Sequence, residues 1–273
     1  MELEVLVATV GQIDCSLAEK MNITVPAVIA NQCGKWSYDE GAAGNIRMLS
    51  TDTKGVGINR NLALQMAQGD ILLFADDDVT YYEDGLQGVI DAFRELPDAD
   101  IIFFAMDYTR NGEIFDRRRH KTKRLHIYNS LRYGAARMAI RRRALESKSL
   151  SFTTLFGGGC QYGSGEDTVF IVGAFRAGLR VYSHSHILGS CAKDCSSWFC
   201  GYSEKFFYDR GAMIACAFPK TKHLMKWYFA AKLSKKSKTP LKTVLHQMNR
   251  GIRGFSNLAP YGAEQTPKEE SPQ

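Results

Sequence analysis

Three consecutive carboxylates, Asp76, Asp77 and Asp78, follow a short apolar run that begins after Asp70. The run reads Ile-Leu-Leu-Phe-Ala, which predicts a strand buried on both faces. Adjacent acids repel one another unless a cation lies among them, and oxygen ligands suit Mg²⁺ or Mn²⁺ shared with the phosphates of a ligand. Ligands of open α/β sheets bind at the carboxyl ends of the strands, where these acids would lie. The alternative interpretation is a solvated acidic turn.

The segment upstream of the acids favours the ligand-binding interpretation. Lys54, Gly55 and Gly57 precede residues 58–68, whose apolar side chains recur at helical spacing. The start of such a helix offers N–H groups to an anion, and Lys54 and Arg60 add positive charge. The full glycine pattern of dinucleotide-binding proteins and the P-loop are both missing from the sequence, so a more particular motif is needed.

Two motifs in this order resemble family 2 glycosyltransferases with the GT-A fold, of the bacterial capsule and polysaccharide type. Residues 54–64, Lys-Gly-Val-Gly-Ile-Asn-Arg-Asn-Leu-Ala-Leu, followed by Asp-Asp-Asp-Val at 76–79, are similar to the donor half of that family. Phe-Gly-Gly-Gly at 156–159 and Gly-Ser-Gly-Glu-Asp-Thr at 163–168 are similar to its acceptor-side Glu-Asp motif. The resemblance covers about residues 3–210.

The resemblance implies a role for individual residues. Asp167 is the expected catalytic base, with acceptor-binding residues Glu166, Gly158 and Gly159. The expected donor-binding residues are Thr9, Asn31, Gln32, Lys54, Arg60, Asp76 and Asp77. The expected metal ligands are Asp76, Asp78 and His186. Asp77 is interpreted either as a further metal ligand or as an acceptor for ribose hydroxyls, and Asn31-Gln32 stands where family members often carry an acid that reads the nucleobase.

The expected activity is metal-dependent, inverting transfer of a single sugar. The resemblance implies a nucleotide-sugar donor, a UDP-sugar first, a glycan or lipid-linked glycan acceptor, and Mn²⁺ or Mg²⁺ as cofactor. The Gln/Arg-x-x-Arg-Trp signature of processive synthases is missing, which favours single addition over polymerisation. The alternatives are a catalytically inactive carbohydrate-binding relative and a sugar-nucleotide pyrophosphorylase.

Composition is typical of a cytoplasmic enzyme. The 273 residues are 45% hydrophobic and 23% charged, and they can form one sizeable α/β core. No signal peptide and no apolar stretch of membrane-spanning length is recognised. Seven scattered cysteines suit a reducing compartment. Cys191, Cys195 and Cys200 after His184 and His186 favour buried free thiols over a zinc site, since the usual ligand spacing is missing.

The remaining sequence predicts further α/β units. Strands are expected over 24–31, 100–106 and 179–183, and helices around 86–93 and over 166–177. Residues 108–143 are interpreted as a basic, irregular loop that is either solvated or in contact with phosphate. The basic residues lack interleaved aromatic side chains, so nucleic acid is not an expected partner. The predicted fold is a GT-A, Rossmann-like, mostly parallel sheet flanked by helices.

The C-terminal segment is the most basic part of the chain. Residues 220–254 contain ten Lys or Arg and no Asp or Glu, whereas the whole chain carries a formal net charge of +6. Two apolar stripes at helical spacing lie within it. The predicted domains are residues 1–218 for the transferase, 219–258 for a basic helical extension and 259–273 for a flexible tail. The extension either docks on an anionic membrane surface, placing the enzyme peripherally on the inner face of the cell membrane, or packs on the catalytic domain.

Overall fold

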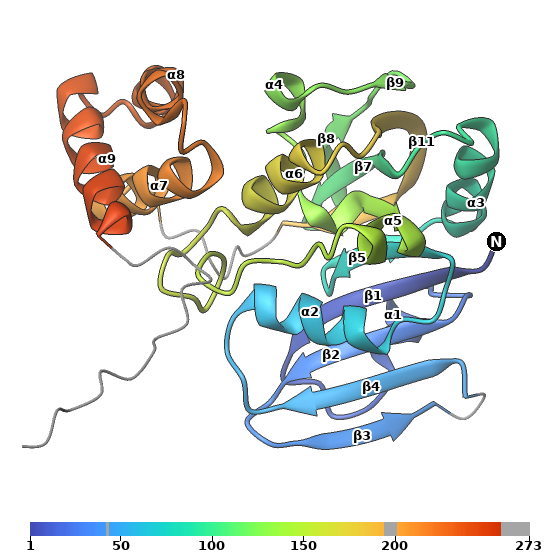
Figure 1. Cartoon of the computed structure of the whole chain (residues 1–273). Helices are drawn as coiled ribbons and strands as arrows, with labels where there is room; N and C mark the ends of the chain where they lie inside the picture. Colours follow the sequence, from blue (N-terminus) through green and yellow to red (C-terminus); the bar gives the residue numbers. More distant parts are fainter. Residues whose placement is uncertain (42–43, 194–200, 258–273) are drawn as a thin grey trace, which may run out of the picture. The chain divides into compact units, whose positions relative to one another are not determined.

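The computed structural model describes residues 1–41, 44–193 and 201–257. The chain divides into two compact units, residues 1–200 and residues 201–273. Figure 1 shows an α/β N-terminal unit and a C-terminal unit of helices.

A single mixed sheet forms the centre of the N-terminal unit. In order across the sheet, its strands are β3 (Ser37–Glu40), β4 (Ile46–Thr51), β2 (Ala27–Gln32), β1 (Leu3–Val10), β5 (Ile71–Asp76), β10 (Met138–Arg141), β7 (Ile101–Arg110), β11 (Val181–Ala192) and β6 (Val79–Tyr81). β8 (Glu113–Arg118) pairs with β7, and β9 (Lys123–Arg124) pairs with β11. β4, β2, β1 and β5 run parallel, whereas β10 runs antiparallel to both β5 and β7.

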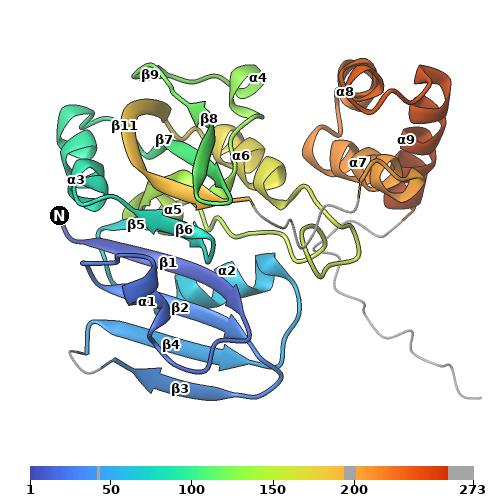
Figure 2. The same ribbon diagram turned by 180° about the vertical axis from the view of Figure 1, so that it is seen from behind.

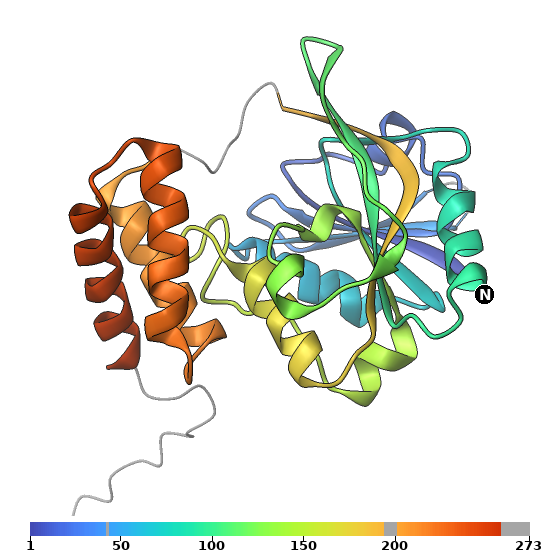
Figure 3. The same cartoon turned by 90° about the horizontal axis from the view of Figure 1, so that it is seen from above.

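Helices cover both faces of this sheet because the strand residues alternate between two apolar clusters. In β1, Leu3, Val5 and Val7 face one cluster and Leu6 faces the other. The first cluster includes residues of α1 (Leu17–Lys20) and α3 (Gly85–Glu95), and the second includes residues of α2 (Val56–Met66), α5 (Arg142–Ser147) and α6 (Glu166–Arg176). α2 lies in front of the strands in Figure 1 and α1 lies in front of them in Figure 2. Figure 3 shows α3 and α6 on opposite sides of the strands.

The parallel strands end together at one edge of the sheet. Thr9 near the end of β1 pairs with Asn31 of β2, and Ala8 pairs with Asp76 of β5. This register gathers the carboxyl ends of the three strands, the edge at which open α/β sheets bind ligands.

Most sequence-predicted elements of the N-terminal unit are present with shifted ends. The helix expected over 58–68 is α2, and the strand expected over 179–183 is the first part of the longer β11. The prediction of an irregular loop over 108–143 is wrong. This stretch contains β8, β9, α4 (Ile127–Ser130), a 3-10 turn (Ala135–Arg137) and β10, which pairs between β5 and β7. Arginines flank the short apolar run of β10, so periodicity gave no signal for it.

The C-terminal unit contains α7 (Glu204–Ala217), α8 (Lys222–Ser237) and α9 (Leu241–Ser256). Two glycines let α7 and α9 approach closely: a methyl group on Gly211 would overlap the backbone of Met248, and one on Gly251 would overlap the backbone of Tyr208. α7 therefore packs with the basic helices, and the two compact units divide near residue 200, whereas the sequence prediction placed a domain boundary at 218. The predicted tail, residues 259–273, lies outside the described residues. None of the helices in the described part of the chain combines the length and the hydrophobicity that a membrane span requires.

Candidate active site

The three consecutive aspartates occupy the turn between β5 and β6, and each has a different partner. Asp76 ends β5 and accepts a hydrogen bond from Arg60 at 2.9 Å. Asp77 accepts one from the Thr9 hydroxyl at 2.5 Å, and burial raises the pKa of Asp77. Asp78 Oδ2 pairs with Lys193 Nζ at 2.8 Å, whereas its Oδ1 is buried without a hydrogen-bond partner. The predicted acidic cluster is therefore a structured turn in a basic surrounding.

Arg60 joins the two sequence motifs. Its side chain is 4% exposed, and its guanidinium donates to Asp76 and Asp167 at 2.9 Å each and to Glu166 at 3.4 Å. The guanidinium also lies over the ring of Phe152, 5.3 Å from the centroid. One buried cation thus connects the end of β5 with the start of α6.

Neighbouring residues of α2 hold Arg60 in this position. The Asn59 amide donates to the Thr9 and Ala30 carbonyls, at 3.0 and 2.8 Å, which ties α2 to the ends of β1 and β2. Asn61 exchanges two hydrogen bonds of 2.8 Å with the backbone of Phe152. A methyl group on Gly57 would overlap the Thr153 carbonyl, so only glycine permits α2 to lie this close to the 152–153 backbone.

Asp167 is a half-buried carboxyl in the first turn of α6. Burial and the charges of Glu166 and Asp76 raise its pKa, Arg60 lowers it, and the net result is a pKa of about 7. The preceding Gly165 has a φ of 125°, a conformation that favours glycine. A carboxyl with this pKa exchanges a proton readily near neutral pH, which is the property of a general base.

The glycines of the second motif contact the start of α2. The Val56 N–H donates to the Gly158 carbonyl at 3.0 Å, and a methyl group on Gly159 would lie 3.1 Å from the backbone nitrogen of Gly55. The Cys160 thiol also lies at this helix start, where a methyl group on Gly55 would overlap it. Because the chain itself covers the first turn of α2, this helix start does not present the anion site that the glycines suggested.

A cavity of about 320 Å³ opens beside Asp76 and Asp167. Its lining residues are Asp76, Met106, Tyr108, Arg118, Leu131, Arg132, Tyr133, Gly134, Ala135, Ala136, Arg137, Asp167, Cys191 and Lys193. Three arginines and a lysine face two carboxylates, so the cavity suits an anionic ligand. The sequence prediction did not include these four cations among the site residues. The only signal for Arg118 was its place in the basic stretch of residues 108–143.

The residues expected to hold the nucleoside differ in their availability. Asn31 is fully buried, donates to the Gln12 carbonyl and the Ser50 hydroxyl, and accepts from the Gln12 N–H, so the structure uses its amide internally. The Gln32 amide donates to Thr53 and to the Gly55 carbonyl. Lys54 is exposed. Sequence reasoning missed the internal role of Asn31 because only the register of β1 and β2 reveals it.

His186 is not brought to the aspartates. Its ring packs against α3, where Nε2 lies 3.1 Å from the Gly85 carbonyl, and the neighbouring His184 pairs with Glu95 at 3.0 Å. The expected metal ligation by His186 therefore has no support in the position of its side chain. Cys191 is buried, and this burial together with the charge of the nearby Asp78 raises the pKa of its thiol to about 12. Cys195 and Cys200 lie outside the described residues.

Two of the expected ligands fit part of a divalent metal shell. Asp76 and Asp78 offer carboxylate oxygens, and the unpartnered Oδ1 of Asp78 is an acceptor that a cation would satisfy. Within residues 1–41, 44–193 and 201–257, no three His, Cys, Asp or Glu side chains are grouped to hold a metal ion. Further ligands would therefore come from the bound substrate, as is usual for Mg²⁺.

Comparison with known proteins gave a match to a family model and matches to solved structures, three of which are described below. Residues 37–153 match the model of glycosyl transferase family 2. No curated protein sequence matches the chain. The S. aureus TarS fragment 1–349 with UDP-GlcNAc is 17% identical, with a TM-score of 0.63, over 93% of this chain and 80% of that one. The same fragment with UDP is 18% identical, with a TM-score of 0.57, over 86% and 71%. A longer TarS structure is 17% identical, with a TM-score of 0.58, over 86% of this chain and 43% of its own length. Identities this low show a shared fold.

Proposed function

Since residues 37–153 place this chain in glycosyl transferase family 2 and its fold is GT-A, we propose that it transfers one sugar, with inversion, from a UDP-sugar to a hydroxyl group of a glycan. The observation that supports this most directly is the link that Arg60 makes between Asp76 and Asp167. Both carboxyl groups line one cavity, and that of Asp167 has a pKa of about 7. Two of the TarS structures contain UDP-GlcNAc and UDP, respectively, which favours uridine in the donor.

Asp167 acts as the base in the proposed reaction. Its carboxylate takes the proton of the acceptor hydroxyl, the acceptor oxygen bonds to the anomeric carbon, and the bond from that carbon to the diphosphate breaks. Arg60 holds Asp167 in place and limits the rise of its pKa, so that the base is partly ionised at neutral pH. Glu166 shares Arg60 and lies beside the base, which suits a role in holding the acceptor.

The diphosphate leaves with additional negative charge, and cationic side chains of the cavity can stabilise that charge. Lys193 lies at Asp78 and Arg118 lines the same cavity. A Mn²⁺ or Mg²⁺ held by Asp76 and Asp78 would supply further charge stabilisation at the diphosphate oxygens.

Substitution of Asp167 separates chemistry from donor binding. Asp167→Asn keeps the shape of the side chain and removes the base, so we expect UDP affinity within about twofold and turnover reduced at least about 10²-fold. Activity is measured as UDP release across a panel of nucleotide sugars with Mn²⁺, and product configuration by NMR. Asp91→Asn, on the exposed face of α3, is the matched control.

Three other results would contradict the proposal. A catalytically inactive relative would bind UDP and release none from any donor. A pyrophosphorylase would instead form a nucleotide sugar from a sugar phosphate and a nucleoside triphosphate. A product with retained configuration would overturn the inverting mechanism.

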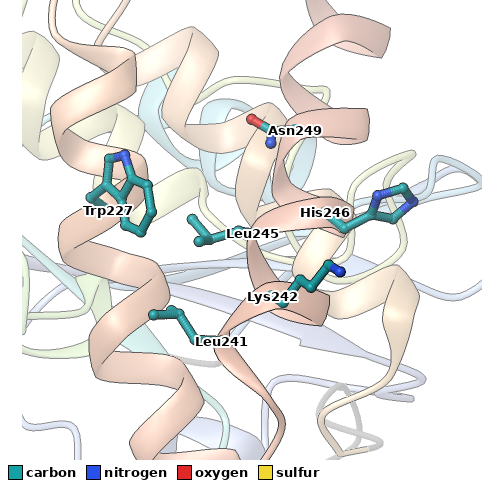
Figure 4. A pocket seen from close by; sticks show the side chains of 6 residues that line it. All are labelled: Trp227, Leu241, Lys242, Leu245, His246 and Asn249. Carbon is teal, nitrogen blue, oxygen red and sulfur yellow. The ribbon is translucent and has the colours of Figure 1, made fainter.

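We propose in addition that the C-terminal unit docks the enzyme on the anionic inner face of the cell membrane. Leu224, Trp227 and Tyr228 of α8 are exposed on this unit, by 70%, 54% and 48%. Figure 4 shows Trp227 facing α9 residues across a pocket of about 420 Å³. The apolar stripe of α9 instead packs within the unit, where Val244, Met248 and Ile252 are buried. An exposed apolar stripe among lysines is the pattern of an interfacial helix.

Liposome binding tests this docking. Trp227→Ser with Leu224→Ser should reduce salt-sensitive binding of the full chain to phosphatidylserine vesicles about tenfold or more, because apolar insertion and basic attraction act together. Met225→Ser, on the less exposed side of α8, is the control for helix stability. Unchanged binding of the double variant would refute the docking proposal without affecting the transferase proposal.

A further inference from the structure

Three arginines gather along the cavity around the turn at residues 135–137. Arg137 is 4% exposed, and its guanidinium donates to His120 Nε2 at 3.0 Å and to the Arg132 carbonyl at 3.2 Å. Arg137 and Arg132 both lie over the ring of Tyr133, 5.0 and 5.3 Å from its centroid. Arg118 lines the same cavity.

Neither Arg132 nor Arg137 has a carboxylate partner in the described part of the chain. The ion pairs found there place Arg118 with Asp116 and Lys193 with Asp78, but they include neither of these two arginines. His120 does not compensate the charge, because burial and the surrounding arginines lower its pKa to about 4 and leave it a neutral acceptor. A buried cation without a counter-charge is costly, and ligand binding commonly supplies the missing anion.

The arginine pair lies on the Asp167 side of the cavity. A methyl group on Gly134 would lie 3.1 Å from Asp167 Oδ2, so the backbone between Arg132 and Arg137 borders the proposed base directly. The diphosphate is expected instead at Asp78, in the turn after β5, and at its partner Lys193, which follows β11. An anion at the arginine pair therefore adjoins the acceptor hydroxyl that Asp167 would deprotonate.

We propose that Arg132 and Arg137 bind a phosphate or carboxylate group carried by the acceptor, so that the enzyme glycosylates an anionic glycan. This inference rests on the proposed transferase function. Planar guanidinium groups suit such oxyanions because they donate parallel hydrogen bonds. A neutral acceptor leaves the buried charge of Arg137 uncompensated, and the site thereby discriminates against it.

Binding of small probes to the full chain tests the inference. Glucose 6-phosphate, glucuronate and glucose are titrated by calorimetry into enzyme saturated with UDP and Mn²⁺, and again without UDP. We expect the phosphate or the carboxylate probe to bind at least about tenfold more tightly than glucose, and the better probe identifies the group. Arg137→Lys and Arg132→Gln should each weaken that binding about tenfold while leaving UDP affinity within about twofold. Arg132 is exposed, so its variant tests the site even where a change at Arg137 disturbs folding.

Each contrary outcome has one meaning. Equal binding of all three probes, anion binding that survives both substitutions, or displacement of the anion by UDP would overturn the inference. A loss of UDP affinity in Arg132→Gln would assign the arginines to the donor instead. Arg94→Gln, an exposed arginine of α3, should change neither affinity. Failure of UDP itself to bind would contradict the proposed function, whereas the titration without UDP still tests the arginine site.

Discussion

The pH dependence of transfer gives a sharp test of Asp167. Its pKa of about 7 in the free enzyme means that kcat/KM should rise tenfold per pH unit below 7 and level off above it. At pH 5 the ionised fraction is about one hundredth, so kcat/KM should be about 100-fold below its plateau. Burial is the largest cause of the raised pKa, and the charge of Glu166 is the next. Glu166→Gln should therefore move the acid limb to lower pH, by on the order of one unit.

The assay is UDP release between pH 5 and 9 at low donor concentration, in buffers of constant ionic strength. Arg60→Gln provides the opposite shift, because removing the favourable charge moves the limb to higher pH. Glu146→Gln is the control, since this exposed residue of α5 pairs only with Arg142 among the ion pairs of the described residues. A flat profile, or a limb that moves upward in Glu166→Gln, would refute the assignment of Asp167.

Three further outcomes are expected. Asp78→Asn should abolish detectable transfer and weaken Mn²⁺-dependent UDP binding measured by calorimetry, and full activity in excess EDTA would contradict this. In Arg60→Lys, the lysine cannot bond Asp76 and Asp167 in the same geometry, so turnover should fall at least about tenfold and the Tm, measured by calorimetry, by several degrees. Unchanged turnover and Tm would show that the link is dispensable. The pKa of Asp167 is higher in the folded than in the unfolded chain, so ionisation of Asp167 destabilises the fold; this destabilisation is absent below about pH 4 and complete above about pH 7. Asp167→Asn should therefore raise the Tm by a few degrees at pH 8 and leave it unchanged at pH 4. The reverse order would show that the charge is stabilising.

Local sequence patterns were sufficient to predict the elements that end at the site. The uninterrupted apolar run followed by acids predicted a buried strand that ends at the surface, and β5 with Asp76 at its end confirms this. The apolar spacing after Gly57 predicted α2, and the glycines before Glu166 predicted the start of α6. These features depend on residues within about ten positions of one another, and short-range periodicity and backbone sterics determine them.

Contacts between distant segments required the folded structure. Arg60 meets Asp167 across 107 positions, and no local pattern indicates which carboxylates a buried guanidinium will join. Arg132 and Arg137 reach the same cavity only because β10 inserts antiparallel between β5 and β7 and so carries the preceding turn to the base. Sequence alone identified the aspartates at the end of β5, Arg60 and the Glu166-Asp167 pair as residues that could do chemistry, and it predicted the strand and helices that carry them. Tertiary packing decided which of these residues share one cavity and what pKa they have, because both depend on burial and on charges that only the fold brings within a few ångströms.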